Sequence, residues 1–370
     1  MMTPAMVNQE AGLAGSFPPP LLDLKGCRRA EVADFVRALG EPEFRGRQIF
    51  SWLYRPFMTD FAQMSDLSRA FRERLPEVAR ISRLELAAQE QSQDGTVKYA
   101  FRLDDGQVIE SVLIPDQGRH TLCVSSQVGC AMGCRFCLTG GLGFIRNLRP
   151  AEIVNQIHFV QEELHAAGQG RLNNLVFMGM GEPLANLDNL FASLDILLDP
   201  LGLNFSDRKI TVSTCGLTPR LAEFGRASSV NLAISLHAAD DETRNLLMPV
   251  NASYPLAGLL AACRQYPLPK RRRIMMEYLL IAGVNDSLAA ARKLVKILHG
   301  IPCKINLLPF NESPALPYHR PPPATVLAFQ QLLARAGFTA VVRDSRGADI
   351  SAACGQLAGQ NLLEVAGETR

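Results

Sequence analysis

The chain has 370 residues, of which 47% are hydrophobic, and a formal net charge of +2. This length exceeds the roughly 250–300 residues at which a single hydrophobic core stops growing, so we expect one large domain and a smaller one. The near-neutral charge excludes a uniformly basic surface, so any contact with nucleic acid must be local. No apolar run approaches the roughly 18–20 residues that span a bilayer, so we expect no membrane association.

Residues 1–20 are polar and rich in proline, which predicts a flexible tail and no secretory signal peptide. The nine cysteines of the chain are then typical of a reducing compartment. We therefore expect a cytoplasmic protein.

Residues 21–80 have the periodicity of helices. Apolar residues recur three and four positions apart in residues 31–39, and Gly40 suits the end of that helix. Two further helices are expected over residues 44–54 and 67–75. The pattern predicts a small all-helical N-terminal domain.

Residues 81–115 change to the alternation of strands. Two alternating segments, residues 97–103 and 108–114, flank the turn residues 104–106. This pattern predicts a β-hairpin that links the helical domain to the larger, C-terminal domain.

From residue 116 onward, short apolar segments alternate with helical ones, which predicts a parallel sheet. The expected strands are residues 121–125, 174–178, 209–213, 231–236, 274–281, 304–309 and 339–343. The expected helices are residues 150–168, 186–198, 217–226, 254–265, 286–299 and 324–336. We predict an α/β fold, a partial (βα)6-type TIM barrel over residues 116–350, followed by a C-terminal segment, residues 351–370.

Three cysteines, Cys130, Cys134 and Cys137, stand within eight residues. Three thiolates on one loop can bind three irons of a four-iron cluster and leave the fourth iron open for a chelating small molecule. Structural zinc would need a fourth ligand nearby, and no histidine lies between His120 and His158. A thioredoxin-like redox pair would not need Cys130. The triplet resembles that of the radical S-adenosylmethionine (SAM) superfamily.

Unusual residues follow most of the expected strands, and the carboxyl ends of barrel strands are where such folds build active sites. The Gly-Met-Gly-Glu-Pro segment ending at Pro183 follows the second strand of the barrel, and glycines there let the backbone approach a ligand. In the radical SAM superfamily the corresponding segment contacts the amino group of SAM. The candidate SAM-binding residues are Gly181, Glu182, Ser213, Ser235, Leu236, His237 and Asn311.

Two cysteines outside the triplet also fall at the expected barrel mouth. Cys123 ends the first strand of the barrel, and Cys354 lies in a glycine-flanked segment after the last strand. A free cysteine is usually a small buried apolar residue, but a thiolate at the mouth can act as a nucleophile or a methyl carrier.

Six segments in order along the chain, together with both outer cysteines, resemble the RlmN family of dual-specificity adenine-C2 methyltransferases. They are residues 121–130, 143–149, 179–184, 234–238, 303–309 and 353–359. The resemblance runs from about Leu24 to Gly359.

The resemblance implies a radical SAM enzyme with one [4Fe-4S] cluster on Cys130, Cys134 and Cys137. One SAM methylates Cys354, and a second SAM is cleaved to a 5′-deoxyadenosyl radical that activates this methyl group for addition to C2 of adenine. The family gives Cys123 as disulfide partner of Cys354. It also makes Glu110 the candidate proton acceptor.

The implied substrates are 23S ribosomal RNA and transfer RNA, with a flavodoxin-type electron donor and a monomeric enzyme. We expect the helical domain to contact RNA, together with three basic groups. These groups are Arg45 with Arg47, Arg146 with Arg149, and residues 270–273. Two alternatives stay open: a C8-adenine methyltransferase of the antibiotic-resistance type, and a non-catalytic iron–sulfur protein that binds RNA.

Overall fold

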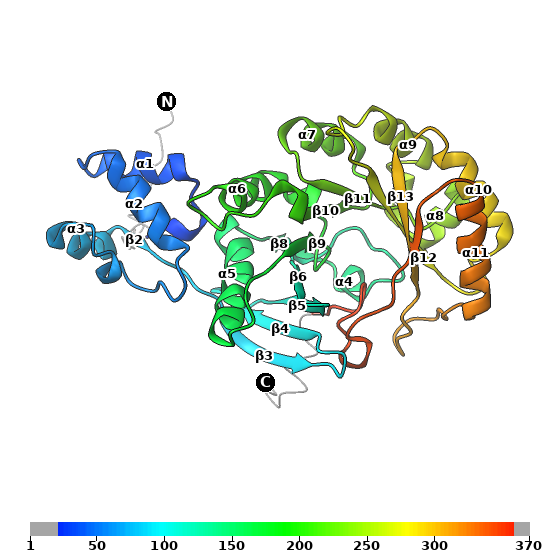
Figure 1. Cartoon of the computed structure of the whole chain (residues 1–370), viewed down its shortest axis with the longest axis horizontal. Coiled ribbons are helices and arrows are strands. Elements are labelled where there is room, and N and C mark those ends of the chain that lie inside the picture. The colour runs from blue at the N-terminus through cyan, green and yellow to red at the C-terminus, as the bar shows by residue number, and fades with distance from the viewer. Residues whose placement is uncertain (1–20, 359–370) are drawn as a thin grey trace, which may run out of the picture.

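The structure, a computed structural model, describes residues 21–358 (Figure 1). The expected flexible tail, residues 1–20, and the last part of the C-terminal segment, residues 359–370, lie outside the described residues. In the part that is described, no helix is long and apolar enough to cross a membrane.

The N-terminal domain is a helical module at one end of the molecule (Figure 1). Its elements are β1 Leu22–Asp23, α1 Arg29–Ala38, α2 Phe44–Leu53, α3 Arg69–Arg74 and β2 Ala79–Arg80. Gly46 lets α1 and α2 cross closely, because a Cβ there would lie 2.6 Å from the Cα of Ala33. The module shares its apolar core with Val154 and Ile196 of the barrel helices, so it is packed against the larger domain. Its two strands form a short parallel pair that the helical pattern did not predict.

One ten-stranded sheet forms the larger domain. Its strands are β3 Glu85–Gln91, β4 Val97–Arg102, β5 Val108–Asp116, β6 Arg119–Cys123, β9 Asn174–Phe177, β10 Ile210–Thr214, β11 Asn231–Ser235, β12 Ile274–Leu280, β13 Cys303–Pro309 and β14 Ala340–Val342. The spatial order is β14-β13-β12-β11-β10-β9-β6-β5-β4-β3, and the strands from β6 to β14 are parallel. The predicted α/β partial barrel is confirmed. The predicted hairpin, β4 and β5, does more than link two domains, because it extends the barrel sheet with antiparallel strands.

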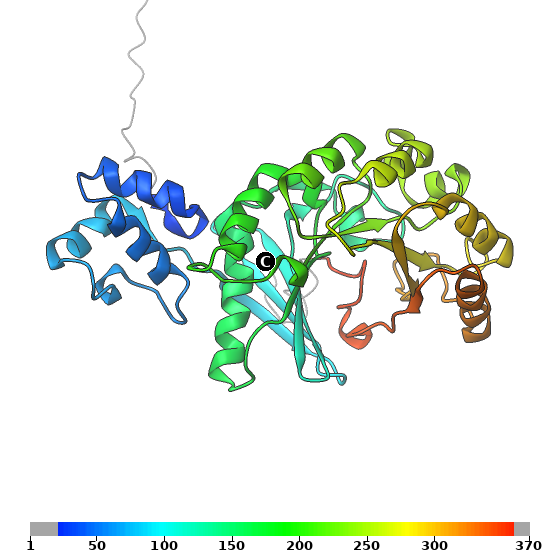
Figure 2. The ribbon, with the colours of Figure 1, turned by 45° about the horizontal axis from the view of Figure 1, so that its top comes forward.

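Helices cover the outer face of the parallel strands (Figure 2). They are α5 Pro150–Ala166, α6 Leu187–Leu198, α7 Thr218–Ala227, α8 Asp241–Leu247, α9 Leu256–Gln265, α10 Leu288–Leu298 and α11 Pro323–Arg335. Side chains alternate between the two faces of a strand. Leu232, Ile234 and Met276 therefore pack into the core, while their neighbours Ser235 and Glu277 face the barrel interior.

The barrel is open between its edge strands, β14 and β3, and the segment after β14 crosses this opening (Figure 2). We call residues 344–358 the C-terminal strap. Lys98 Nζ donates a hydrogen bond to the Ile350 carbonyl oxygen at 2.6 Å, and Ser92 Oγ bonds Asp349 Oδ1 at 2.6 Å. The strap thus joins the last strand to the turn between β3 and β4.

Candidate active site

The cysteine loop, residues 130–143, connects two short antiparallel strands, β7 Gln127–Gly129 and β8 Phe144–Asn147. The sequence pattern did not predict these strands. The Cys130 N–H donates to the Gly143 carbonyl oxygen at 2.8 Å. Gly129 has a φ of +71°, and a Cβ there would lie 1.9 Å from that same oxygen, so only glycine fits. The base of the loop is therefore fixed, and the short helix α4 Leu138–Gly141 begins directly after Cys137.

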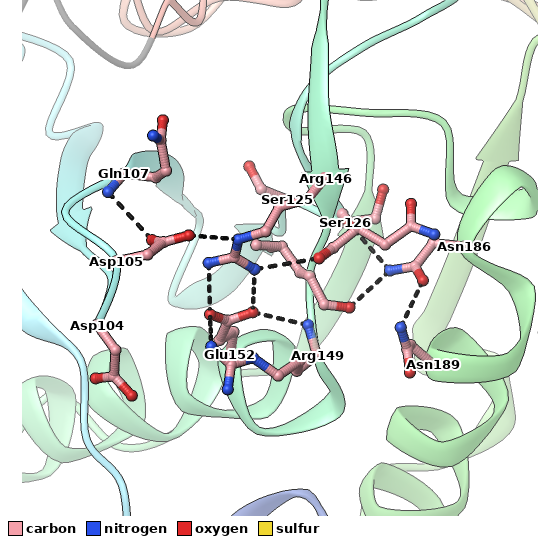
Figure 3. A network of polar contacts seen from close by, with 12 residues as sticks. Asp104, Asp105, Gln107, Ser125, Ser126, Arg146, Arg149, Glu152, Asn186 and Asn189 are labelled. Atoms are coloured by element: carbon pink, nitrogen blue, oxygen red, sulfur yellow. Dashed lines mark hydrogen bonds and ion pairs between the residues drawn. The ribbon is translucent and has the colours of Figure 1, made fainter. Parts of the chain in front are cut away.

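Arg146 ties this loop to the rest of the barrel (Figure 3). Its guanidinium donates two hydrogen bonds of 2.8 Å to the Glu152 carboxylate on α5, and a third of 2.6 Å to Asp105 in the β4–β5 turn. All three of these hydrogen bonds join the Arg146 guanidinium to carboxylates of the same chain. Arg146 thus fixes the loop through three carboxylate hydrogen bonds, and its predicted contact with RNA stays a prediction.

Asn186 also fixes the two chain segments at the base of the cysteine loop (Figure 3). Its amide donates to the carbonyl oxygens of Ser126 and Leu148, both at 2.8 Å, on the two chain segments that flank the cysteine loop. Asn189 in turn donates to Asn186 Oδ1 at 2.8 Å and fixes its orientation.

The three loop cysteines are free thiols and partly exposed. Burial raises the pKa of Cys130 to about 12 and raises the pKa of Cys134, and the thiols raise each other's pKa, so they lie close together. Among the described residues no group of His, Cys, Asp or Glu side chains is arranged to hold one metal ion. Thiolates of a four-iron cluster each bind a different iron, so a cluster does not need such an arrangement.

A buried cation beside the loop fits an anionic cluster. Arg244 on α8 has 0% exposure and no ion pair with any described carboxylate. It donates to the carbonyl oxygens of Cys215 (2.6 Å) and Leu236 (3.1 Å) and to Asn251 Oδ1 (2.7 Å). An unpaired buried charge is costly, and the charges of Cys134 and Cys215 act on Arg244. A cluster bound by three thiolates would supply the missing negative charge.

Gly181 and Glu182 lie at the carboxyl end of β9, next to the cysteine loop. Gly181 has a φ of +100°, and a Cβ there would lie 2.5 Å from the Gln127 side chain. Glu182 is buried, and its oxygens accept hydrogen bonds from the N–H groups of Leu184 (3.0 Å) and Cys215 (2.8 Å). Burial raises the pKa of Glu182. An ammonium group would stabilise this carboxylate, as expected for the SAM amino group.

The remaining candidate SAM residues lie along successive strand ends. The hydroxyls of Ser213 and Ser235 are 3.4 Å apart, and Leu236 follows at the end of β11. Asn311 follows β13 and accepts a hydrogen bond from the hydroxyl of Ser345 in the strap. The structure thus places these side chains around one mouth.

His237 is held by the barrel. Its Nδ1 accepts the Leu279 N–H at 3.0 Å, its ring packs edge-to-face on Phe136 of the cysteine loop at 4.9 Å, and its φ is +57°. Burial and the charge of Arg244 lower the pKa of His237 to about 3, so the ring is neutral. With Nδ1 accepting, Nε2 carries the proton.

The strap brings Cys354 into the mouth. The Leu138 N–H donates to the Gly355 carbonyl oxygen at 2.7 Å, so the residue after Cys354 lies against the cysteine loop. The residue Cys354 as a whole is exposed, but burial of its thiol, together with Glu277 and Cys137, raises the pKa of this thiol to about 11. Burial raises the pKa of Cys123, and the Cys354 thiol raises it further, so the two thiols lie within range of electrostatic interaction.

Glu110 lies on β5 beneath the strap. It is 1% exposed, and its Oε2 accepts the Ala358 N–H at 3.0 Å. This hairpin glutamate is therefore buried beside the segment that carries Cys354, and not solvated as hairpin glutamates usually are.

The basic run of residues 270–273 lies away from the barrel mouth. It precedes β12 and so stands at the amino end of that strand, opposite the mouth. The Arg272 side chain is 12% exposed and pairs with Asp207 at 2.6 Å. This run is therefore not placed to guide RNA into the mouth.

The sequence reasoning missed Gln127, Asn186, Arg244 and Glu277. A charged residue inside the apolar segment 274–281 was a signal for Glu277. No comparable signal marks Arg244, because the Asp-Glu-Thr-Arg sequence of its helix is typical of a solvent-exposed surface.

The open parallel barrel, with a three-cysteine loop after its first parallel strand, defines a radical SAM enzyme. The model of the radical SAM superfamily matches residues 124–295, and the model described as the ribosomal RNA large subunit methyltransferase N-terminal domain matches residues 22–81. The crystal structure of a radical SAM methyltransferase from Sphaerobacter thermophilus superimposes with a TM-score of 0.86 at 44% identity, covering 91% of this chain and 99% of that one.

Two curated relatives, both named dual-specificity RNA methyltransferase RlmN, extend this likeness to the whole enzyme. The relative from Desulfotalea psychrophila is 54% identical over 91% of this chain and 95% of its own length. The relative from Geobacter sulfurreducens is 53% identical over 92% of this chain and 93% of its own length. The chain belongs to the RlmN family and is a radical SAM methyltransferase that uses a [4Fe-4S] cluster and SAM. Membership sets aside the non-catalytic alternative.

Proposed function

We propose that this enzyme methylates C2 of adenine in 23S ribosomal RNA and in transfer RNA, with Cys354 as the methyl carrier. The observation that carries the proposal is the position of Cys354. The backbone of the next residue, Gly355, is hydrogen-bonded to the cysteine loop, and the Cys354 thiol acts electrostatically on Cys123, which supports this role.

Cys130, Cys134 and Cys137 would hold the cluster, with Arg244 as the buried counter-charge. When bound, the cluster with SAM supplies a radical that can take a hydrogen atom from a methyl group. Glu182 would receive the SAM amino group. Ser213 and Ser235 present hydroxyls along the floor of the same mouth.

The carrier is needed because adenine C2 is a poor nucleophile and would not displace a methyl group from a sulfonium directly. Cys354 holds the methyl group as a thioether and delivers it as a carbon radical. After addition to C2, the adduct would give up one electron, which the bound cluster could take, and the C2 proton. The Cys123 thiolate would then attack the Cys354 sulfur, the methylene carbon would take a proton to become the methyl group of the product, and a Cys123–Cys354 disulfide would form. Glu110, buried beneath the strap, is the proposed acceptor for the C2 proton.

RNA must bring the target base out of its stack to reach this mouth. Arg47 is exposed on the helical module and has no carboxylate partner among the residues described, which favours this module as an RNA contact. The reducing electron must come from another protein, and we propose a flavodoxin-type donor to a monomeric cytoplasmic enzyme.

The test is the Cys354→Ala variant, assayed with ribosomal RNA and transfer RNA and with mass spectrometry of the digested nucleosides. The wild type is expected to form 2-methyladenosine, and the variant none above background. Formation of 8-methyladenosine by the wild type would support the C8 alternative. Native product levels from Cys354→Ala would overturn the carrier scheme.

A further inference from the structure

The amino end of the barrel, opposite the mouth, carries a concentration of positive charge. The segments that lead into β10, β11, β12 and β14 are residues 207–209, 226–231, 267–273 and 335–339, and we call them the basic end. They contain eight arginine or lysine residues and one acidic residue, a net charge of +7, whereas the whole chain has +2. The near-neutral charge of the chain therefore results from two oppositely charged parts.

Hydrogen bonds join the segments of the basic end into one surface. The Arg272 guanidinium donates to the Asp207 carboxylate at 2.6 Å and to the Ser229 carbonyl oxygen at 2.8 Å. It also donates to Asn231 Oδ1 at 3.0 Å, and the Asn231 amide donates to the Arg208 carbonyl oxygen at 2.9 Å. Arg272 thus connects the amino ends of β10, β11 and β12, and it pairs with the one carboxylate of the basic end.

The other seven cations of the basic end are exposed, and none of them forms an ion pair with a carboxylate in the part of the chain that the structure describes. They are Arg208, Lys209, Arg226, Lys270, Arg271, Arg273 and Arg335. The Arg273 guanidinium lies 3.4 Å from Thr339 Oγ1, which connects β12 to the segment before β14. Clustered cations without carboxylate partners attract polyanions.

A tight turn before β12 presents two of these cations. The Arg272 N–H donates to the Pro269 carbonyl oxygen at 3.0 Å, so Lys270 and Arg271 are the central residues of this turn. Arg271 has a φ of +65°, in a region that favours glycine or asparagine over arginine. The turn therefore carries an arginine where the backbone conformation alone favours a smaller residue.

An RNA backbone is the polyanion that this surface fits. Beside the turn, a shallow groove of about 470 Å³ has Arg226, Ser228 and Ser229 in its lining, and arginine and serine are common phosphate contacts. None of the large apolar side chains that are exposed in the described part of the chain belongs to the basic end. Amphipathic membrane anchors and the cores of protein interfaces use such side chains, so RNA is favoured over both.

The basic end is too far from the mouth to contact the target base. Strand β12 has seven residues and rises about 3.3 Å per residue, so roughly 23 Å separate its two ends. An RNA with its adenine in the mouth reaches the basic end only if it continues along the side of the barrel. The RNA segment bound there is therefore remote from the target adenine.

We propose that the basic end is a second RNA-binding surface, which holds the phosphate backbone of a ribosomal RNA segment remote from the target adenine. This inference rests on the proposed 23S ribosomal RNA substrate. The surface adds affinity for a long substrate and takes no part in the chemistry at the mouth. A minimal stem–loop that carries the target adenine does not reach it.

The test neutralises the two cations of the turn in the variant Lys270→Gln/Arg271→Asn, since asparagine tolerates the positive φ of residue 271. The control variant, Arg292→Gln/Lys293→Gln, removes two exposed charges from α10. Binding to the minimal stem–loop, and to the same stem–loop extended by its flanking 23S ribosomal RNA, is measured from 50 to 300 mM salt with the cluster-loaded full chain.

The turn variant should bind the extended RNA about tenfold more weakly than the control at physiological salt, because two phosphate contacts are lost. Its salt slope should fall by about 1 for each lost contact. Binding of the stem–loop, and formation of 2-methyladenosine in it, should be equal in both variants and the wild type. Equal binding of the extended RNA by the two variants, or an equal loss on both RNAs, would overturn the proposal.

The wild type gives a second test that does not depend on a variant. Acetylation of lysines by an N-hydroxysuccinimide ester is followed by peptide mass spectrometry. The extended RNA should protect Lys209 and Lys270 but not Lys293 on α10, and the stem–loop should protect none of the three.

Two further outcomes of the acetylation test are decisive. Protection of Lys209 and Lys270 by phosphatidylserine vesicles but not by the extended RNA would assign the basic end to a membrane surface and contradict the proposal. If the wild type methylates C2 of adenine in neither RNA, the proposed function fails, whereas lysine protection still reports on the basic end. The two failures are thus distinguished.

Discussion

Several buried charged residues determine how this enzyme is assembled. Arg244 binds carbonyl oxygens at the ends of β10 and β11, so a single guanidinium fixes two strand ends beside the cysteine loop. Lys25 is 0% exposed between the helical module and α5. Its Nζ donates to the Leu53 carbonyl oxygen at 2.5 Å and lies 3.3 Å from His158 Nδ1.

Lys25 predicts a specific pH dependence of stability. Burial lowers its pKa to about 7 in the folded state, so between about pH 7 and 10 the unfolded chain binds more protons there than the folded chain. Lys25 therefore makes the free energy of unfolding rise with pH in this range, by at most about 1.4 kcal/mol per pH unit. Lys25→Met should lose this contribution in anaerobic urea titrations.

Lys296→Met is the matched control for Lys25, because Lys296 is exposed on α10. It should keep the wild-type pH dependence. If Lys25→Met also keeps it, Lys25 is not neutral in the folded state.

At the scale of elements, the C-terminal strap is the part that completes the site. It crosses from β14 to the β3–β4 turn and then passes the cysteine loop and Glu110. Lys98 is buried at the crossing, where it holds the Ile350 carbonyl oxygen and pairs with Glu90 at 3.1 Å. The position of Cys354 thus depends on contacts with strands far away in the sequence.

Lys98→Met should loosen this crossing while keeping the apolar stem of the side chain. A hydrogen bond from a charged group contributes roughly 1.5–3 kcal/mol, so hydrogen exchange in residues 344–358 should become at least about tenfold faster. Exchange in α1 and α10 should not change. Lys209→Met, at an exposed lysine, serves as control, and equal strap exchange in Lys98→Met and the wild type would show that the strap is held by other contacts.

Much of this architecture could be predicted at the element scale because apolar periodicity reports burial. All seven expected barrel strands and all six expected barrel helices are found, with ends displaced by two residues or fewer. The short strands β7 and β8 were missed because four residues or fewer carry no period, and their pairing depends on Gly129 and Gly143 across the cysteine loop. The path of the strap was also beyond prediction, since it depends on side chains such as Lys98 that meet it only in three dimensions.

At the scale of the whole molecule, the site joins parts from both ends of the larger domain. The cysteine loop, the strand ends and the strap could be assigned to one mouth from the sequence, because strands of a parallel barrel end on the same side. The basic groups could not be placed in this way. Arg146 is held by Glu152 and Asp105, and the run before β12 lies at the opposite end of the barrel.

The central claim is that the methyl group reaches RNA through Cys354, and SAM with a fully deuterated methyl group tests it directly. The carrier methyl loses one hydrogen atom before transfer, so methyladenosine from RNA should carry two of the three deuterium atoms. Single-turnover reactions with enzyme already methylated on Cys354 without deuterium should give unlabelled product first. Product that retains all three deuterium atoms, or that is labelled from the first turnover, would contradict transfer through Cys354.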